Sequence, residues 1–186
     1  MKIKELDIQG PLIIEPKVFP DQRGCFYESF NIKKLSELGI NANFVQDNVS
    51  KSKKGVVRGL HYQLDPFSQA KLIIVLSGKI LDVIVDVRKG SPTFGKHVSV
   101  ELASKDHKVF FIPKGFAHGF IALEADTIVQ YKCDEYYSPK HERGINILDP
   151  TLNIDWNYPK DKIIIADRDL QFPLFDKAEM NFIYEA

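Results

Sequence analysis

Short apolar runs separated by turn residues fill the middle of the chain. Two of them, residues 71–76 and 80–87, are rich in β-branched side chains and flank residues 77–79, whose central glycine predicts a hairpin turn. Short strands spaced at such intervals predict an all-β sandwich or barrel. Similar runs follow at residues 97–102, 108–112, 116–123 and 127–133.

The two ends of the chain are patterned differently from its middle. Residues 11–30 read as strands that two prolines and a turn interrupt. Residues 32–38 predict a short helix, which Gly39 ends. The tail after Pro139 is rich in proline and aspartate, so we expect loops there and a short helix near Glu142.

Composition and charge narrow the class of protein. The chain has 186 residues, 44% of them hydrophobic, and shows no linker or repeat, so we expect one domain over residues 1–186. Acidic and basic residues balance at 25 each, which argues against nonspecific binding to nucleic acid.

Cys25 and Cys133 are expected to be reduced thiols. With neither a signal-peptide pattern nor an apolar run of membrane-span length, the sequence predicts a cytoplasmic protein that does not bind membranes.

Polar side chains interrupt the apolar pattern at two places, residues 58–63 and residues 113–119. In the first, His61 and Gln63 share one face of an extended chain, and Lys71 follows closely. Burying such groups inside a small barrel costs several kcal/mol unless they form hydrogen bonds or ion pairs, or take part in binding or catalysis. The pattern therefore predicts a binding or catalytic cavity inside the barrel.

The second polar run ends at His118 and has the form Pro-x-Gly-x-x-His, which resembles the second signature of the cupin β-barrels. In cupins this histidine is usually a metal ligand, and a first signature adds a His-x-His pair and a glutamate. Here the first signature reads His61-Tyr-Gln63, followed by Gln69 and Lys71. Glutamine is a poor ligand for a transition metal, and an ammonium group repels a divalent cation. We therefore expect a cupin-like barrel with no metal and no other cofactor.

Without a cofactor, the chemistry must come from side chains. His61 suits a general base because the ordinary pKa of histidine lies near neutrality, although a histidine that is only structural fits the same pattern. Lys71 could stabilise a developing oxyanion, but a solvated lysine at a strand end is an equally good interpretation. Arg58 reaches this group only if a bulge at Gly59 redirects the strand.

Tyr131 shares a face with Val129 and Cys133, so we expect it to point inward. There it could donate a phenolic proton. A buried tyrosine more often packs and makes a single hydrogen bond. Patterning alone leaves both roles open.

A series of motifs runs along the chain in one order: FPDQRG at 19–24, ESF at 28–30, FVQDN at 44–48, SKS at 50–52, VRGLHYQ at 57–63, VDVR at 85–88, SPTFG at 91–95, IPKGFAHGF at 112–120, YK at 131–132, YYSP at 136–139, DP at 149–150 and IDW at 154–156. This series resembles the dTDP-4-dehydrorhamnose 3,5-epimerase family nearly from end to end. The resemblance implies an isomerase with a cupin-like jelly-roll β-barrel and short helices. It also implies a reaction, the epimerisation of dTDP-4-dehydro-6-deoxy-D-glucose to dTDP-4-dehydro-L-rhamnose at C3 and C5, within dTDP-L-rhamnose synthesis.

The resemblance also implies roles for individual residues. His61 matches the base of the family, Asp169 its hydrogen-bonding partner, and Tyr131 the acid that delivers a proton to the opposite face. Lys71 falls on the lysine near the C4 carbonyl, and Tyr137 on an aromatic residue near the thymine. The substrate-binding positions fall on Arg23, Glu28, Gln46, Asn48, Arg58, His118, Tyr137, Glu142 and Arg168.

The tail departs slightly from the family pattern. Arg168 stands where the family often has lysine, which keeps the charge but changes the geometry of the donors. Ala166 stands where the family often has serine.

Inversion of a carbon next to a ketone explains why these residue types are needed. The C4 ketone acidifies the hydrogens on C3 and C5, so a base can remove one and leave an enolate. Reprotonation from the other face inverts the carbon and requires an acid opposite the base, which His61 and Tyr131 on different strands would supply. Lys71 would stabilise the oxyanion, and three arginines would offset the diphosphate charge.

Three other functions remain open on the sequence. An enzyme that inverts only C5 or only C3 of a related nucleotide-linked keto sugar would share the fold and the base. A metal-dependent oxygenase would need the missing His-x-His pair. A non-catalytic sugar-binding cupin would need no acid and base, so the joint presence of His61, Tyr131 and Asp169 argues against it.

The resemblance further implies a homodimer in which the N-terminal strands extend to the partner barrel. Arg23 and Glu28 must lie near His61 to bind the same substrate. They belong to a segment broken by prolines, which is poorly suited to an interior strand. Exchange of this segment between protomers would bring these residues to a shared site.

Overall fold

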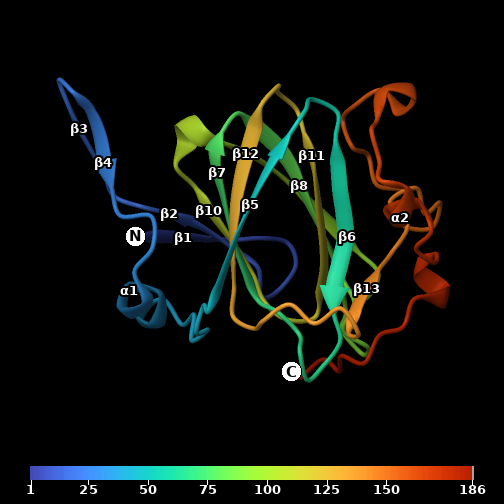
Figure 1. The fold of residues 1–186 in the computed structure, drawn as a ribbon. Helices are drawn as coiled ribbons and strands as arrows, with labels where there is room; N and C mark the ends of the chain where they lie inside the picture. The colour runs from blue at the N-terminus through green and yellow to red at the C-terminus, as the bar shows by residue number, and fades with distance from the viewer. Residues whose placement is uncertain (186) are drawn as a thin grey trace.

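The computed structural model describes residues 1–185 and shows two antiparallel β-sheets that face each other (Figure 1). The first sheet has six strands, in the spatial order β1 (Lys2–Glu5), β2 (Leu12–Glu15), β10 (Val109–Ile112), β7 (Lys71–Ser77), β12 (Thr127–Cys133) and β5 (Gln46–Ser52). The second has five, in the order β13 (Glu142–Gly144), β6 (Val57–Gln63), β11 (Phe116–Ala122), β8 (Lys79–Asp86) and β9 (His97–Ala103). The prediction of an all-β fold is confirmed.

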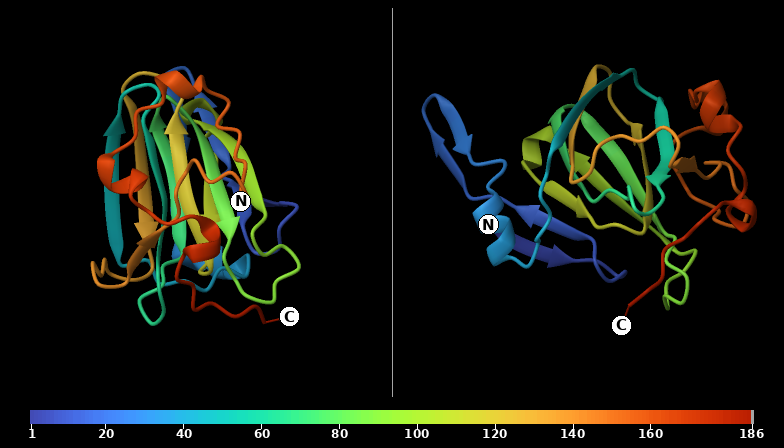
Figure 2. Two further views of the ribbon diagram at one scale, coloured as in Figure 1. Left: turned by 90° about the vertical axis from the view of Figure 1, so that its right-hand side faces the viewer. Right: turned by 60° about the horizontal axis from the view of Figure 1, so that its bottom comes forward.

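Three apolar clusters explain why several strands are apolar along their whole length. One cluster fills the space between the two sheets and includes Ile73, Ile84 and Phe120. A second lies on the outer face of the five-stranded sheet, where the C-terminal tail covers it with Trp156 (Figure 2). The third lies under the short helix on the other sheet and includes Leu35. Strands covered on both faces carry apolar side chains at successive positions rather than in alternation.

The predicted hairpin at residues 77–79 is wrong. β7 and β8 follow each other closely in the chain, but β7 belongs to the six-stranded sheet and β8 to the five-stranded one. The turn is therefore a corner between sheets. Gly78 has a φ of +78°, and a Cβ there would lie 2.5 Å from Oγ1 of Thr127. A turn containing glycine can form either a hairpin within one sheet or a corner between two sheets, so local sequence could not distinguish the two.

The helix α1 (Ile32–Glu37) confirms the expected short helix. Asn31 caps it, since its side chain accepts a hydrogen bond from the backbone N–H of Lys34. Gly39 follows with a φ of +83°, the left-handed conformation common just beyond helix ends.

The predicted helix near Glu142 is also wrong, because β13 occupies that position. Its residues pair with β6 in the register Glu142↔Gln63 and Gly144↔His61. This long-range pairing outweighs local propensity. The short helices are instead η1 (Ser104–Asp106), η2 (Lys160–Lys162), α2 (Asp167–Leu170) and η3 (Phe175–Lys177).

A hairpin of β3 (Val18–Asp21) and β4 (Gly24–Tyr27) projects from the barrel as an arm (Figures 1 and 2). Phe26 is 70% exposed and Phe19 50% exposed on this arm. Two exposed phenylalanines on one two-stranded arm form an unusual surface for an isolated chain. No helix among residues 1–185 is both long enough and apolar enough to cross a membrane.

Candidate active site

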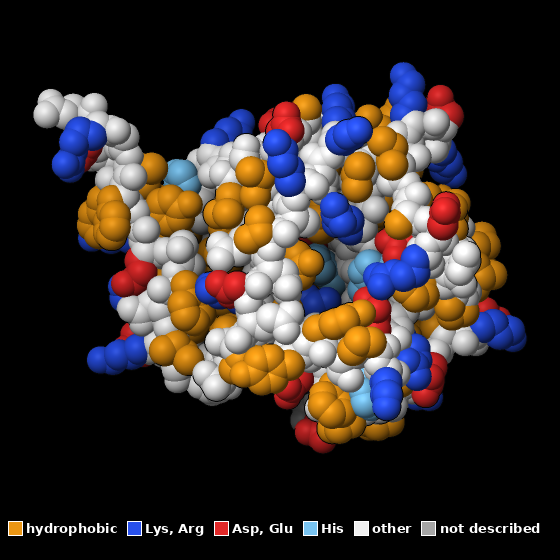
Figure 3. All heavy atoms as spheres, in the orientation of Figure 1, with side chains coloured by type: hydrophobic (Ala, Val, Ile, Leu, Met, Phe, Trp, Pro, Cys, Tyr) orange, Lys and Arg blue, Asp and Glu red, His pale blue; other side chains and the backbone are white. Residues whose placement is uncertain are grey.

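A cavity of about 650 Å³ opens between the two sheets, and histidine and basic side chains are visible in it (Figure 3). All but two of the predicted site residues line this cavity. They come from both sheets, from the loop after β12 and from α2. The residues in question are Gln46, Asn48, Arg58, His61, Lys71, His118, Tyr131, Tyr137, Glu142, Arg168 and Asp169.

Arg23 and Glu28 do not line the cavity of their own chain. Arg23 lies on the arm, its side chain is 85% exposed, and it pairs with Asp21 at 2.6 Å. Glu28 follows the arm and pairs with Lys34 at 2.7 Å. The single chain therefore does not bring these two predicted substrate-binding residues to its own cavity.

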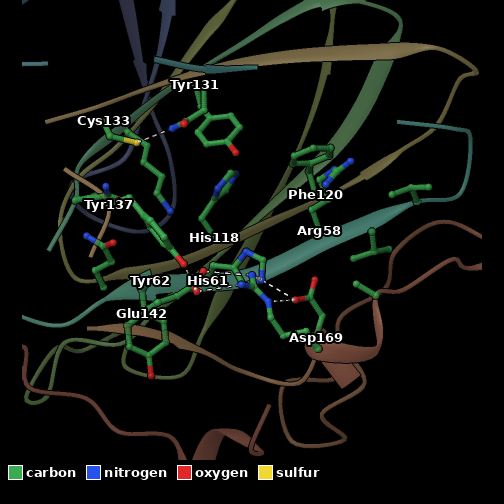
Figure 4. Close-up of a pocket in the computed structure, with 18 of the residues that line it drawn as sticks. Arg58, His61, Tyr62, His118, Phe120, Tyr131, Cys133, Tyr137, Glu142 and Asp169 are labelled. Atoms are coloured by element: carbon green, nitrogen blue, oxygen red, sulfur yellow. Dashed lines mark hydrogen bonds and ion pairs between the residues drawn. The ribbon is translucent and has the colours of Figure 1, made fainter. Parts of the chain in front are cut away.

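His61 and Asp169 are 108 residues apart in sequence and form a direct pair (Figure 4). Nε2 of His61 lies 2.9 Å from Oδ1 of Asp169. Asp169 is 4% exposed and also accepts a hydrogen bond of 3.4 Å from the backbone N–H of Gly59. Burial alone would raise the pKa of Asp169, but the hydrogen bond and charge of His61 hold that pKa below its ordinary value. An ionised Asp169 can orient the imidazole and stabilise its protonated form.

Tyr131 faces this pair from the other sheet. It lies on β12 and pairs in register with Asn48 of β5, whereas His61 lies on β6 (Figure 4). Burial, followed by the nearby Cys133, raises the pKa of Tyr131 above its ordinary value. The phenol therefore stays protonated at neutral pH, as a proton donor must.

Lys71 and His118 lie in the same interior space. Lys71 begins β7 and is only 8% exposed, and burial lowers its pKa. His118 pairs in register with His61, and its Nε2 lies 2.9 Å from Oδ2 of Asp82. Asp82 was not among the site residues predicted from the sequence. An acidic residue inside an apolar strand was the available signal.

Arg58 lines the cavity beside a strand irregularity at Gly59, the condition that the sequence pattern set for it. The pairing of β6 with β11 shifts register between Arg58 and His61. Gly59 has a φ of +122°, and a Cβ there would lie 2.6 Å from the backbone oxygen of His118. Only glycine fits so close an approach. Arg58 then donates to Oγ of Ser52 at 3.1 Å.

A polar network of Arg168, Glu142 and Tyr137 connects the cavity wall to the His61 pair. Arg168 donates to both carboxylate oxygens of Glu142, at 3.1 and 3.2 Å, and the hydroxyl of Tyr137 donates to Glu142 at 2.8 Å. Nη2 of Arg168 also lies 3.5 Å from Nε2 of His61. Two-pronged pairing of this kind suits an arginine better than the lysine often found in the family.

These features define the class of protein: a small β-barrel with a carboxylate–imidazole pair and a phenol on opposite walls of one cavity, an arrangement that suits proton transfer. Within residues 1–185, no three histidine, cysteine or acidic side chains form a group that could hold a metal ion.

Comparison with known proteins identifies the family. The model of the dTDP-4-dehydrorhamnose 3,5-epimerase family matches residues 5–177. The dTDP-4-dehydrorhamnose 3,5-epimerase of Shigella flexneri is 47% identical over 180 residues, which are 96% of this chain and 98% of the relative. The chain belongs to the dTDP-4-dehydrorhamnose 3,5-epimerase family, so the predicted family and the predicted isomerase class are confirmed.

Solved structures agree with this membership. A dTDP-6-deoxy-D-glucose-3,5-epimerase from Legionella pneumophila Philadelphia 1, solved in complex with dTDP-4-keto-L-rhamnose, has a TM-score of 0.94 at 46% identity and covers 100% of this chain and 99% of its own. The dTDP-4-dehydrorhamnose 3,5-epimerase of Elizabethkingia anophelis NUHP1 has a TM-score of 0.92 at 45% identity, with 96% and 99% covered. The predicted cupin-like jelly-roll fold is confirmed.

Proposed function

We propose that this protein inverts C3 and C5 of dTDP-4-dehydro-6-deoxy-D-glucose and releases dTDP-4-dehydro-L-rhamnose. The observation that carries the proposal is the placement of His61 with Asp169 on one wall of the cavity and Tyr131 on the other. Inversion needs a base and an acid on opposite faces of the sugar, and a binding module needs neither.

The chemistry begins at the ketone. His61 removes the proton from C3 or C5, and Asp169 stabilises the imidazolium that results. The electrons move onto the C4 oxygen, where the ammonium of Lys71 stabilises the enolate. Tyr131 then delivers its phenolic proton to the opposite face of the same carbon. Solvent must take the proton from His61 and return one to Tyr131 before the second carbon reacts.

Charged residues around the cavity suit the nucleotide part of the substrate. The guanidinium groups of Arg58 and Arg168 offset the charge of the diphosphate, with Arg23 supplied by a second chain. Tyr137, half exposed at the cavity, offers an aromatic face for the thymine. The remaining polar side chains that we assign to substrate binding are Gln46, Asn48, His118, Glu142 and Glu28.

Incubation of the purified protein with dTDP-4-dehydro-6-deoxy-D-glucose in deuterated water tests the function. We expect proton NMR to show deuterium at both C3 and C5, because each carbon loses its proton and regains one from solvent. Deuterium at one carbon alone would favour the single-site epimerase. Deuterium at neither would leave a sugar-binding barrel.

We also propose a homodimer in which each arm completes the site of the partner. Three facts support it: the arm projects from its barrel, it exposes Phe19 and Phe26, and it carries Arg23 far from its own cavity. Full burial of an exposed phenylalanine contributes roughly 1.5–3 kcal/mol, and the part of Phe19 and Phe26 that is still exposed, 50% and 70%, would contribute the corresponding share against a second barrel. The dimer and the cytoplasmic location expected from the sequence both remain predictions.

Mixed dimers test whether the site is shared. An Arg23→Ala chain combined with a His61→Ala chain should regain part of the lost activity, because one pocket of the heterodimer then holds both residues. The measurement is product formation after subunit exchange, compared with each variant alone. The matched control combines Tyr131→Phe with His61→Ala, since both residues belong to one barrel and no pocket is restored. Monomeric behaviour at micromolar concentration, or no complementation, would count against the shared site.

A further inference from the structure

Asp82 is a buried carboxylate inside the barrel to which the family resemblance assigned no role. It lies on β8 and is 0% exposed. Its Oδ2 accepts from Nε2 of His118 at 2.9 Å, while its Oδ1 is buried and makes no hydrogen bond within residues 1–185. A carboxylate held in this way is costly unless positive charge lies close to it.

Strand alternation places Lys71 and Asp82 in the same interior space. Lys71 shares its face of β7 with Ile73, and Asp82 shares its face of β8 with Ile84. Ile73 and Ile84 belong to the single apolar cluster between the sheets. Lys71 and Asp82 therefore lie on strands of opposite sheets and project into one low-dielectric interior.

The proposal below rests on the proposed function and deepens it. We propose that Asp82 is a positioning residue, whose carboxylate holds the His118 ring and balances the charge of Lys71, so that the ammonium stays protonated beside the reacting sugar. The carboxylate does not touch the substrate. It acts through the two side chains that line the cavity.

The electrostatics of the pair explain why the counter-charge is needed. Burial lowers the pKa of Lys71, which Cys133 and then Asp82 oppose, and burial raises the pKa of Asp82, which His118 and then Lys71 oppose. Loss of the Asp82 charge would lower the pKa of Lys71 further, so the amine would become neutral at a lower pH. A neutral amine stabilises an enolate far less. The other titratable groups that line the cavity are Arg58, His61, Tyr62, His118, Tyr131, Cys133, Tyr137, Glu142, Arg168 and Asp169.

The Asp82→Asn variant removes the charge but keeps an acceptor oxygen for Nε2 of His118. Lysine labelled with carbon-13 at Cε lets the titration of Lys71 be followed by NMR, with the signal assigned by its absence in Lys71→Arg. We expect its titration midpoint to fall by about one unit or more, as for loss of a close opposite charge. At alkaline pH kcat should then fall about tenfold with a smaller change in KM, since one pKa unit is a tenfold change in the charged fraction.

Asp86→Asn is the matched control, because Asp86 is equally buried on the same strand but pairs with Arg88, Ser91 and Thr93 away from the cavity. It should leave the titration of Lys71 unchanged. An unchanged titration in Asp82→Asn would overturn the proposal and leave Asp82 as a structural anchor for His118.

A measurement on the unaltered protein covers the case in which Asp82→Asn does not fold. Aspartate labelled with carbon-13 at Cγ reports whether Asp82 is ionised at neutral pH, and a protonated carboxyl there would also overturn the proposal. Neither NMR titration needs turnover. Failure of the proposed function, seen as no deuterium in the sugar, is therefore distinguishable from failure of the role of Asp82.

Discussion

His61→Asn is expected to abolish both product formation and exchange of sugar hydrogens with solvent. A positioned general base typically contributes ~10²–10⁴-fold to the rate. The imidazole side chain is 25% exposed and packs edge-on against Phe172, so the fold of the variant must be checked beside its activity. The measurement is deuterium incorporation at C3 and C5 by NMR, together with thermal unfolding to show that the barrel is intact.

The control for this variant is His97→Asn, which changes a histidine on β9 that does not line the cavity. It should retain full exchange. Near-normal exchange in His61→Asn would mean that another group is the base. Loss of exchange accompanied by unfolding would be assigned to the unpaired Asp169 instead, and His61→Gln would then repeat the test with a longer side chain.

Tyr131→Phe is expected to impair product formation more than exchange. The variant keeps His61 and Asp169, so deprotonation continues, but the phenolic proton for the opposite face is gone. Product formation should fall by ~10²-fold or more, the usual contribution of a positioned acid. Deuterium should still enter the substrate with its configuration retained, because protons return to the face from which they left.

The measurement compares deuterium in recovered substrate with deuterium in product over one time course. Tyr184→Phe is the control, since this tyrosine donates to the side chain of Gln9 and lies outside the cavity. An equal loss of exchange and product in Tyr131→Phe would show that the side chain mainly shapes the cavity. The two outcomes differ because only an acid acts after the proton has been removed.

Local sequence predicted the conformation of most elements correctly. The β-branched runs formed strands because side chains of that shape pack well in a sheet. Gly39 ended α1, and Gly59 allowed the irregularity that brings Arg58 to the cavity. Each of these outcomes depends on a residue and its immediate neighbours, which is why a linear pattern was enough.

The sequence by itself determined the strands in the middle of the chain, the family and the chemical identity of the groups in the cavity. Only the tertiary structure decided which strands pair, that Glu142 lies on β13 and that Asp82 holds His118, and it confirmed across 108 positions the contact of Asp169 with His61 that the family resemblance implied. It also showed that Arg23 lies outside the cavity of its own chain. The physical reason is the distance along the sequence over which each interaction acts. Backbone preference and burial are properties of neighbouring residues, whereas pairing and charge balance depend on segments that meet only when the barrel closes.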